Sequence, residues 1–251
     1  MAKLEPILHF LERSFEVSSF PDYPYALNGL QVQGPDEVQL IGAAVDASEE
    51  TISEAVRQGV QLLLVHHGLF WGGLGPITGP RYRKVAALIK GNMGLYGLHL
   101  PLDAHPDFGN NALVLRSLDL PPEGRFGFYK EVEIGWWARA ELDRDEISQR
   151  LAKAVGGETR VIPGGPEVVK KVGVLTGAGA SSLEEAADQG LDTLITGEAP
   201  HHSYHEAMEM GLNLILAGHY ATETFGVKAV AGKLAEEFDV SWVFLHFPTG
   251  L

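Results

Sequence analysis

The feature that most constrains the fold of this sequence is an apolar run followed by a helical pattern, which occurs several times. The run Leu40–Val45 precedes a segment that begins at Ser48 with acidic residues and ends at Gly59, as a capped helix does. The next run, Val60–Val65, is apolar at nearly every position, which is typical of a strand buried on both faces. This alternation predicts an α/β fold with a parallel sheet and crossover helices.

The same strand–helix–glycine–strand pattern occurs again in the second half of the chain. Gly42 and Gly173 are 131 positions apart (173 − 42), and Gly59 and Gly190 are also 131 apart (190 − 59). A fixed period predicts an internal duplication, although two generic strand–helix–strand units would share such glycines by chance. We therefore expect two similar α/β units with mostly parallel sheets. The expected units are residues 1–125 and residues 126–251.

The composition narrows the chemistry that the chain can perform. The absence of cysteine excludes disulfides, thiolate nucleophiles and zinc-thiolate sites, so a bound metal would need imidazole and carboxylate ligands. With 19 Lys and Arg against 33 Asp and Glu, the net charge of −14 disfavours nucleic acid and anionic membranes as partners. No apolar run reaches the roughly 18 residues of a membrane helix. The sequence also opens without a signal-peptide pattern, so we expect a cytoplasmic protein.

Histidines and carboxylates directly follow three of the predicted strands. They are His66 and His67 after 60–65, His99, Asp103 and His105 after 93–98, and His219 and Glu223 after 212–217. Ligands of open α/β sheets bind just beyond the carboxyl ends of the strands, so these side chains are expected to converge. Imidazole and carboxylate bind Zn, Mn, Fe or Ni ions, and the residue types favour none of these over the others.

Two of these pairs share one spacing. His99 and Asp103 are four residues apart, as are His219 and Glu223, and each residue is 120 positions from its counterpart (219 − 99 and 223 − 103). A duplicated fold would place Asp103 and Glu223 at equivalent positions around a shared cleft. A single histidine after a strand is ordinarily a hydrogen-bonded turn residue. An adjacent pair at a buried strand end, however, costs much desolvation unless a ligand binds it. The sequence therefore predicts a metal site in the cleft between the units.

Two other clusters are open to more than one interpretation. His201, His202 and His205 have no acidic partner on another strand, so we expect them to line the cleft rather than to bind metal. A small basic cluster is interpreted as a solvated helix start, with a phosphate anchor as the alternative; it consists of Arg81, Arg83 and Lys84. Three aromatic residues either stack on a substrate ring or belong to the core. They are Phe70, Trp71 and Tyr220.

Several strings of residues resemble the Nif-three-like family, whose members are labelled GTP cyclohydrolase 1 type 2 homologues. The strings are Asn28-Gly-Leu-Gln-Val, His66-His67-Gly68-Leu69-Phe70-Trp71, His99-Leu-Pro-Leu-Asp103-Ala and Gly218-His219-Tyr-Ala-Thr-Glu223. They occur in the family's order over essentially the whole chain. The long insert that some members carry between the halves is absent, so the sequence resembles the short form.

The resemblance implies a dinuclear metal site in the cleft between two similar α/β units, and a ring-shaped homohexamer. Family metal ligands fall on His66, His67, Asp103, His219 and Glu223. Two further histidines lie in or beside matching motifs and are candidates for acid–base catalysis. They are His99 and His105.

The function that these observations favour is metal-dependent hydrolysis with two divalent ions. The expected substrate is a phosphorylated or purine/pterin-type small molecule, although the family label alone does not fix a reaction. The alternative is a non-catalytic role in metal storage or delivery, or as a metal-stabilised ring-shaped interaction scaffold. Purely structural metals are disfavoured, because closed structural zinc sites take four protein ligands each and five residues do not fill two of them.

Overall fold

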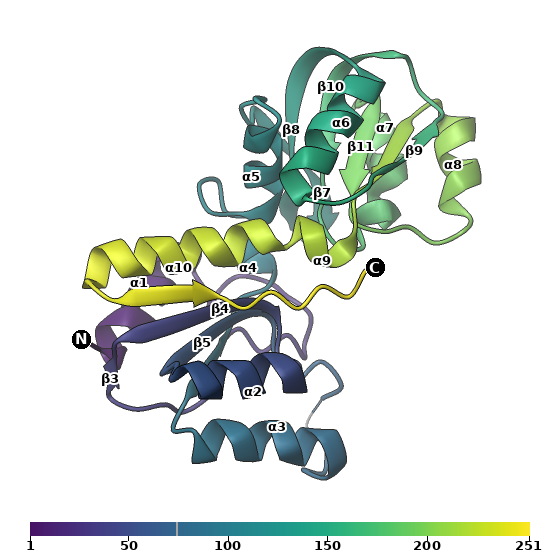
Figure 1. Ribbon diagram of the computed structural model, residues 1–251. Helices are drawn as coiled ribbons and strands as arrows, with labels where there is room; N and C mark the ends of the chain where they lie inside the picture. The colour runs from purple at the N-terminus through teal and green to yellow at the C-terminus, as the bar shows by residue number, and fades with distance from the viewer. Residues whose placement is uncertain (74) are drawn as a thin grey trace. The chain divides into compact units, whose positions relative to one another are not determined.

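The chain forms two compact α/β units in the computed structural model, which describes residues 1–73 and 75–251 (Figure 1). Unit 1 comprises Met1–Leu102 and Gly226–Phe247, and unit 2 comprises Asp103–Phe225 and Pro248–Leu251. This division differs from the expected units 1–125 and 126–251, because a helix and a strand near the C-terminus return to the first sheet. Among the described residues, no helix has the length and apolar character needed to cross a bilayer.

Unit 1 is built on a five-stranded sheet in the order β13-β4-β5-β6-β2. Its strands are β2 (Gly29–Val32), β4 (Leu40–Asp46), β5 (Leu62–His67), β6 (Gly94–Gly97) and β13 (Ser241–Phe244). All neighbours pair in parallel except β2, which is antiparallel to β6. A separate two-stranded ladder joins β1 (Ala2–Lys3) to β3 (Glu37–Val38). The expectation of a mostly parallel sheet is therefore met in this unit.

Helices connect and flank the strands of unit 1. They are α1 (Leu4–Phe15), α2 (Glu49–Gln58), α3 (Gly79–Lys90), the short α4 (Leu100–Asp103) and α10 (Thr224–Phe238). The caps predicted for α2 are present: Ser48 Oγ accepts a hydrogen bond from the Thr51 amide at 3.0 Å, and Gly59 has a left-handed φ of 75°. Helix α3 begins at Gly79, and Pro80 is well suited to its first turn.

Strand β5 places the histidine pair within the sheet rather than after it. Leu62–Val65 are fully buried, as the continuous apolar run predicts. The strand continues two residues beyond the predicted end, because β4 still pairs with it through Asp46 opposite His67. His66 and His67 thus belong to a strand that pairs with β4, and their ring centroids lie 4.7 Å apart at its end.

Unit 2 contains a six-stranded sheet in the order β7-β8-β10-β11-β12-β9. Its strands are β7 (Gly124–Tyr129), β8 (Val132–Asp143), β9 (Arg160–Pro163), β10 (Val168–Val174), β11 (Thr193–Thr196) and β12 (Asn213–Leu216). Only β10, β11 and β12 pair in parallel, and the other neighbours are antiparallel. The expectation of a mostly parallel sheet is wrong for this unit. Strands β7 and β8 form a hairpin, which turns at Lys130 with a φ of 54°.

The remaining elements of unit 2 are helical. They are α5 (Asn110–Ser117), α6 (Arg144–Val155), the 3-10 helix η1 (Gly179–Ser182), α7 (Leu183–Asp188), α8 (Ser203–Met210) and α9 (His219–Thr222). The Asp143 side chain caps the start of helix α6, and Gly156 ends the helix at a φ of 70°. Both units contain three consecutive parallel strands, which is the order that an internal duplication predicts. The duplication itself stays a prediction.

Two glycines give a matched test of the packing. A Cβ at Gly173 of β10 would collide with Leu191 and lie 2.7 Å from Cζ of Phe126, a fully buried ring. Gly173→Ala is therefore expected to lower the free energy of unfolding by about 1–3 kcal/mol. Gly232→Ala in α10 meets no described atom within 4 Å and should raise it by about 0.5–1 kcal/mol. Urea unfolding followed by circular dichroism measures both, and equal stability of the two variants would contradict the packing around β10.

Candidate metal centre

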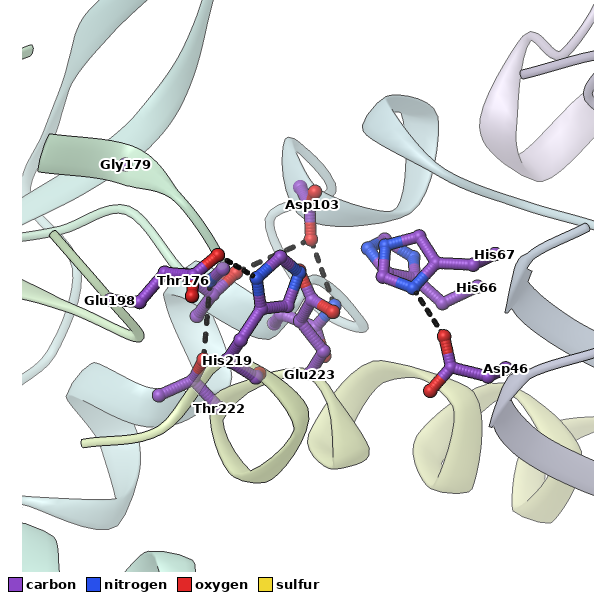
Figure 2. Close-up of polar contacts among 12 residues, drawn as sticks. Asp46, His66, His67, Asp103, Thr176, Gly179, Glu198, His219, Thr222 and Glu223 are labelled. Carbon is purple, nitrogen blue, oxygen red and sulfur yellow. Dashed lines mark hydrogen bonds and ion pairs between the residues drawn. The ribbon is translucent and has the colours of Figure 1, made fainter. Parts of the chain in front are cut away.

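The histidine pair at the end of β5 has one ring nitrogen of each residue fixed by the fold. His66 is 1% exposed, and its Nδ1 lies 2.9 Å from the carbonyl oxygen of Leu98. His67 Nδ1 lies 2.9 Å from Oδ1 of Asp46. A dashed line marks this contact in Figure 2. Carbonyl and carboxylate oxygens only accept hydrogen bonds, so both Nδ1 atoms carry the proton. Nε2 is therefore the coordinating nitrogen of both residues.

His99 is the third imidazole that unit 1 brings to this place. Its Nδ1 donates to Asp22 at 2.9 Å, and the same carboxylate accepts from the backbone amides of Tyr23 and Leu100 and from the Asn28 side chain. Burial of Asp22 raises its pKa, but the hydrogen bond and charge of His99 outweigh burial, so the pKa lies below its ordinary value. One ligand atom each of His66, His67 and His99 lie within 4.8 Å of one another.

Asp103 is the carboxylate that follows the predicted strand 93–98. It belongs to unit 2 and is 6% exposed. Its Oδ1 accepts from Nδ2 of Asn110 at 2.8 Å and from Oγ1 of Thr176 at 3.5 Å. Asn111 supports the same region, because its side chain donates to the carbonyls of Asp103 and Ile134 and accepts from the Thr176 amide. The side-chain amide of Asn110 thus orients the Asp103 carboxylate.

His219 and Glu223 lie together at the start of α9 and just after it. His219 Nδ1 contacts Oε1 of Glu198 at 2.8 Å, and its Nε2 contacts Oε1 of Glu223 at 3.2 Å (Figure 2). Glu223 is 3% exposed. Gly177, with a φ of 64°, passes so close that a Cβ there would collide with the Glu223 carboxylate and lie 3.2 Å from His219 Nε2. A glycine is therefore required beside this pair.

The two carboxylates hold a proton on His219 in the absence of metal. The pKa of His219 is raised to about 9, and the hydrogen bond to Glu223 is the largest cause of the rise. Burial of the ring lowers the pKa, and Glu198 makes a smaller contribution that raises it. A metal ion bound at Nε2 would replace this proton, while Glu198 would keep the hydrogen bond at Nδ1.

The other predicted residues take different places. His105 Nδ1 accepts hydrogen bonds from the amides of Asp107 and Phe108, at 3.0 and 3.1 Å, so its ring orders a loop. The second histidine cluster is exposed at the start of α8, and it forms no potential metal group among the residues that the structure describes. Its members are His201, His202 and His205. Of the aromatic residues, Phe70 packs against the core, Tyr220 is buried, and Trp71 lies beside His67 and His99.

Sequence reasoning did not identify three carboxylates that contact the candidate histidines: Asp22, Asp46 and Glu198. Each accepts a hydrogen bond from Nδ1 of a candidate ligand or catalytic histidine. Asp46 ends β4 beside β5, and Glu198 follows β11, so their positions at strand ends were a signal that could have identified them. Asp22 lies in a proline-rich loop, and nothing in its sequence neighbourhood points to His99.

The His219 contacts predict an unusual titration. Imidazole ¹⁵N NMR of the metal-free protein should show His219 losing its proton only as the pH rises through about 9. Glu223→Gln should lower this pKa more than Glu198→Gln, because the hydrogen bond to Glu223 makes the largest contribution. A His219 midpoint in the ordinary histidine range for the unmodified protein would contradict the geometry of this pair.

The contact between Asp46 and His67 predicts an effect on metal affinity. Asp46→Ala should weaken zinc binding by about 10- to 100-fold, because carboxylates that orient ligand imidazoles have effects of this size. Asp36→Ala is the control, since Asp36 is exposed and its side chain makes no hydrogen bond to a described histidine. Competition with a chromophoric zinc chelator measures both affinities, and equal values would show that Asp46 does not support a ligand.

Comparison with known proteins confirms the resemblance. Residues 2–249 match the family model Duf34/NIF3 (NGG1p interacting factor 3). Proteins named GTP cyclohydrolase 1 type 2 homolog are 44% identical in Deinococcus radiodurans, over 98% of this chain and 94% of the relative, and 42% identical in Archaeoglobus fulgidus, over 99% of both.

Solved structures show the same fold over nearly the full length. Protein ybgI, described as of unknown function, matches with a TM-score of 0.91 and 35% identity over 99% of this chain and 100% of its own. TTHA1606 from Thermus thermophilus matches with a TM-score of 0.87 and 39% identity, with the same coverage. The chain therefore belongs to the DUF34/NIF3 family.

Proposed function

We propose that this protein binds two divalent metal ions and uses them to hydrolyse a phosphorylated or purine/pterin-type small molecule. The proposed ligands are His66, His67, Asp103, His219 and Glu223. The observation that carries the proposal is the set of Nδ1 hydrogen bonds, because imidazoles that bind metals almost always donate their other nitrogen to a carboxylate or carbonyl.

The donor set fits divalent cations. Asp103 and Glu223 are buried, and buried carboxylates are costly unless a positive charge compensates them. Five side chains are fewer than two closed sites require, so coordination positions would remain for water or substrate. When bound, such ions supply Lewis acidity and lower the pKa of water to near neutrality. The ion type is not fixed by these ligands, and Zn, Mn, Fe and Ni all suit them.

Hydrolysis also needs one group that accepts a proton from water and one that donates a proton to the leaving group. His99 is the proposed acceptor, because its Nδ1 proton is held by Asp22 and its Nε2 is therefore the basic nitrogen. His105 is the proposed donor, because its Nδ1 accepts two backbone amides and its proton is therefore on Nε2. These assignments follow from the hydrogen bonds of each ring alone.

A second candidate function is non-catalytic metal storage or delivery. The partial exposure of two proposed ligands favours it, since the side chains of His67 and His219 are 20% and 28% exposed and exposed ligands can exchange an ion. From the family resemblance we also propose that the protein assembles into a homohexameric ring and is located in the cytoplasm. The names of the curated relatives support a purine-type substrate as one of the two classes considered.

Asp103→Asn tests the hydrolase directly. Elemental analysis of unsupplemented protein should find two divalent ions per chain, and a screen of phosphate esters, phosphodiesters and GTP-like rings should find turnover. Asp103→Asn should lower kcat by at least about 100-fold, because the charge of a metal-binding carboxylate is lost. Asp107→Asn, four residues along and exposed, is the control.

The outcomes separate the two candidate functions. Unchanged turnover in Asp103→Asn would refute the hydrolase proposal. Transfer of ions to an apo-acceptor without any turnover would instead support metal delivery.

A further inference from the structure

Arg81, in the first turn of α3, is a partly buried cation with no acceptor among the described residues. Its neighbours in the basic cluster are engaged: Arg83 forms two hydrogen bonds to Glu49, at 2.7 and 2.8 Å, and Lys84 donates to the Ala47 carbonyl at 3.2 Å. Arg81 makes no hydrogen bond or ion pair with any residue in 1–73 or 75–251. The chain has 33 acidic residues and 19 basic residues, so acceptors are abundant. The absence of a described acceptor for Arg81 therefore needs an explanation.

The Arg81 guanidinium lies against the glycine-containing segment that follows Trp71. A Cβ at Gly75 would lie 2.8 Å from Nη1, and a Cβ at Gly72 would lie 3.6 Å from Nη2. The glycines thus make room for the guanidinium close to the backbone. Substitution at Gly75 would displace the flexible end of Arg81 rather than the chain itself.

Trp71 presents a second donor without an acceptor in the same part of unit 1. Its indole Nε1 is buried and has no hydrogen-bond partner among the described residues. The ring centroid lies 4.6 Å from that of His99 and 5.7 Å from that of His67. A buried indole N–H ordinarily finds a partner. Trp71 lies beside two candidate histidines, and the Arg81 guanidinium lies beside Gly72, the next residue in the chain.

Carboxylates near these donors are already bound elsewhere. Asp46 accepts from His67, Asp22 accepts from His99, and Glu49 accepts from Arg83. An anion from outside the chain would supply the acceptor that the described residues lack, and it would also compensate the charge of the guanidinium.

We propose that Arg81 and Trp71 form an anion subsite that binds the phosphate group of the substrate. The planar fork of a guanidinium matches two oxygens of a phosphate, and the indole N–H would donate to the same group. The subsite selects a phosphorylated small molecule over an uncharged purine or pterin ring. Its role in substrate choice rests on the proposed hydrolase function, but its binding of phosphate does not.

Calorimetric titration of inorganic phosphate into metal-free and zinc-loaded full-length protein at low ionic strength tests the subsite. Arg81→Gln should weaken phosphate binding by about 10- to 100-fold in both forms, because charged hydrogen bonds are lost. Arg81→Lys should fall between Arg81→Gln and the unmodified protein, since it keeps the charge without the fork. Trp71→Phe should weaken binding less than Arg81→Gln, because it removes one neutral donor and keeps an aromatic ring.

Two further variants separate local from general effects. Arg83→Gln is the matched control and should bind phosphate as the unmodified protein does, because Glu49 already occupies its guanidinium. Gly75→Ala should weaken binding by displacing Arg81, with little change in the midpoint of thermal unfolding. Loss of binding in Arg83→Gln equal to that in Arg81→Gln would reduce the effect to general charge and overturn the subsite.

The remaining outcomes distinguish the subsite from the proposed function. Phosphate affinity that is unchanged in Arg81→Gln overturns the subsite, even if phosphate esters are hydrolysed. Arg81-dependent phosphate binding without hydrolysis of any ester supports the subsite and refutes the hydrolase. Hydrolysis of a phosphate ester with a KM raised about 10-fold or more in Arg81→Gln supports both.

Discussion

The structure of the candidate metal centre depends on hydrogen bonds at Nδ1 of the histidines. An imidazole offers a metal only the nitrogen that carries no proton, so the partner of Nδ1 decides which nitrogen that is. In unit 1, the Leu98 carbonyl and the carboxylates of Asp46 and Asp22 hold the three Nδ1 protons. In unit 2, Glu198 does the same for His219. The residues that fix the tautomers are as much a part of the site as the ligands.

The sheets fix the backbone positions of the residues that form these hydrogen bonds. Strand β5 is buried from Leu62 to His66 and pairs with β6 as far as Val65, and β4 continues the pairing to His67. The backbone of the histidine pair is therefore part of the sheet rather than of a loop. In unit 2, glycines allow close approach: a Cβ at Gly197 would lie 2.6 Å from Cα of His219. Rigid elements and small residues thus hold the candidate ligands in place at the ends of strands.

Much of this arrangement could be read from the sequence because it follows periodic patterns. The apolar run 60–65 identified the central strand, and the cap residues Ser48 and Gly59 identified α2. The antiparallel edges of the second sheet were missed, because a hairpin such as β7–β8 and a continuous strand share the same alternation of residues. The return of β13 to the first sheet is a long-range pairing with no local signal. Asp22 was missed for the same reason, since its contact with His99 spans 77 residues.

The position of the ions tests the account most directly. Anomalous diffraction at the zinc absorption edge, from crystals grown with zinc, would locate them. The account predicts two strong peaks per chain, each about 2.0–2.2 Å from imidazole nitrogens or carboxylate oxygens of the five proposed ligands. Peaks confined to the exposed histidines at the start of α8, or no peak beside His66 and Glu223, would contradict it.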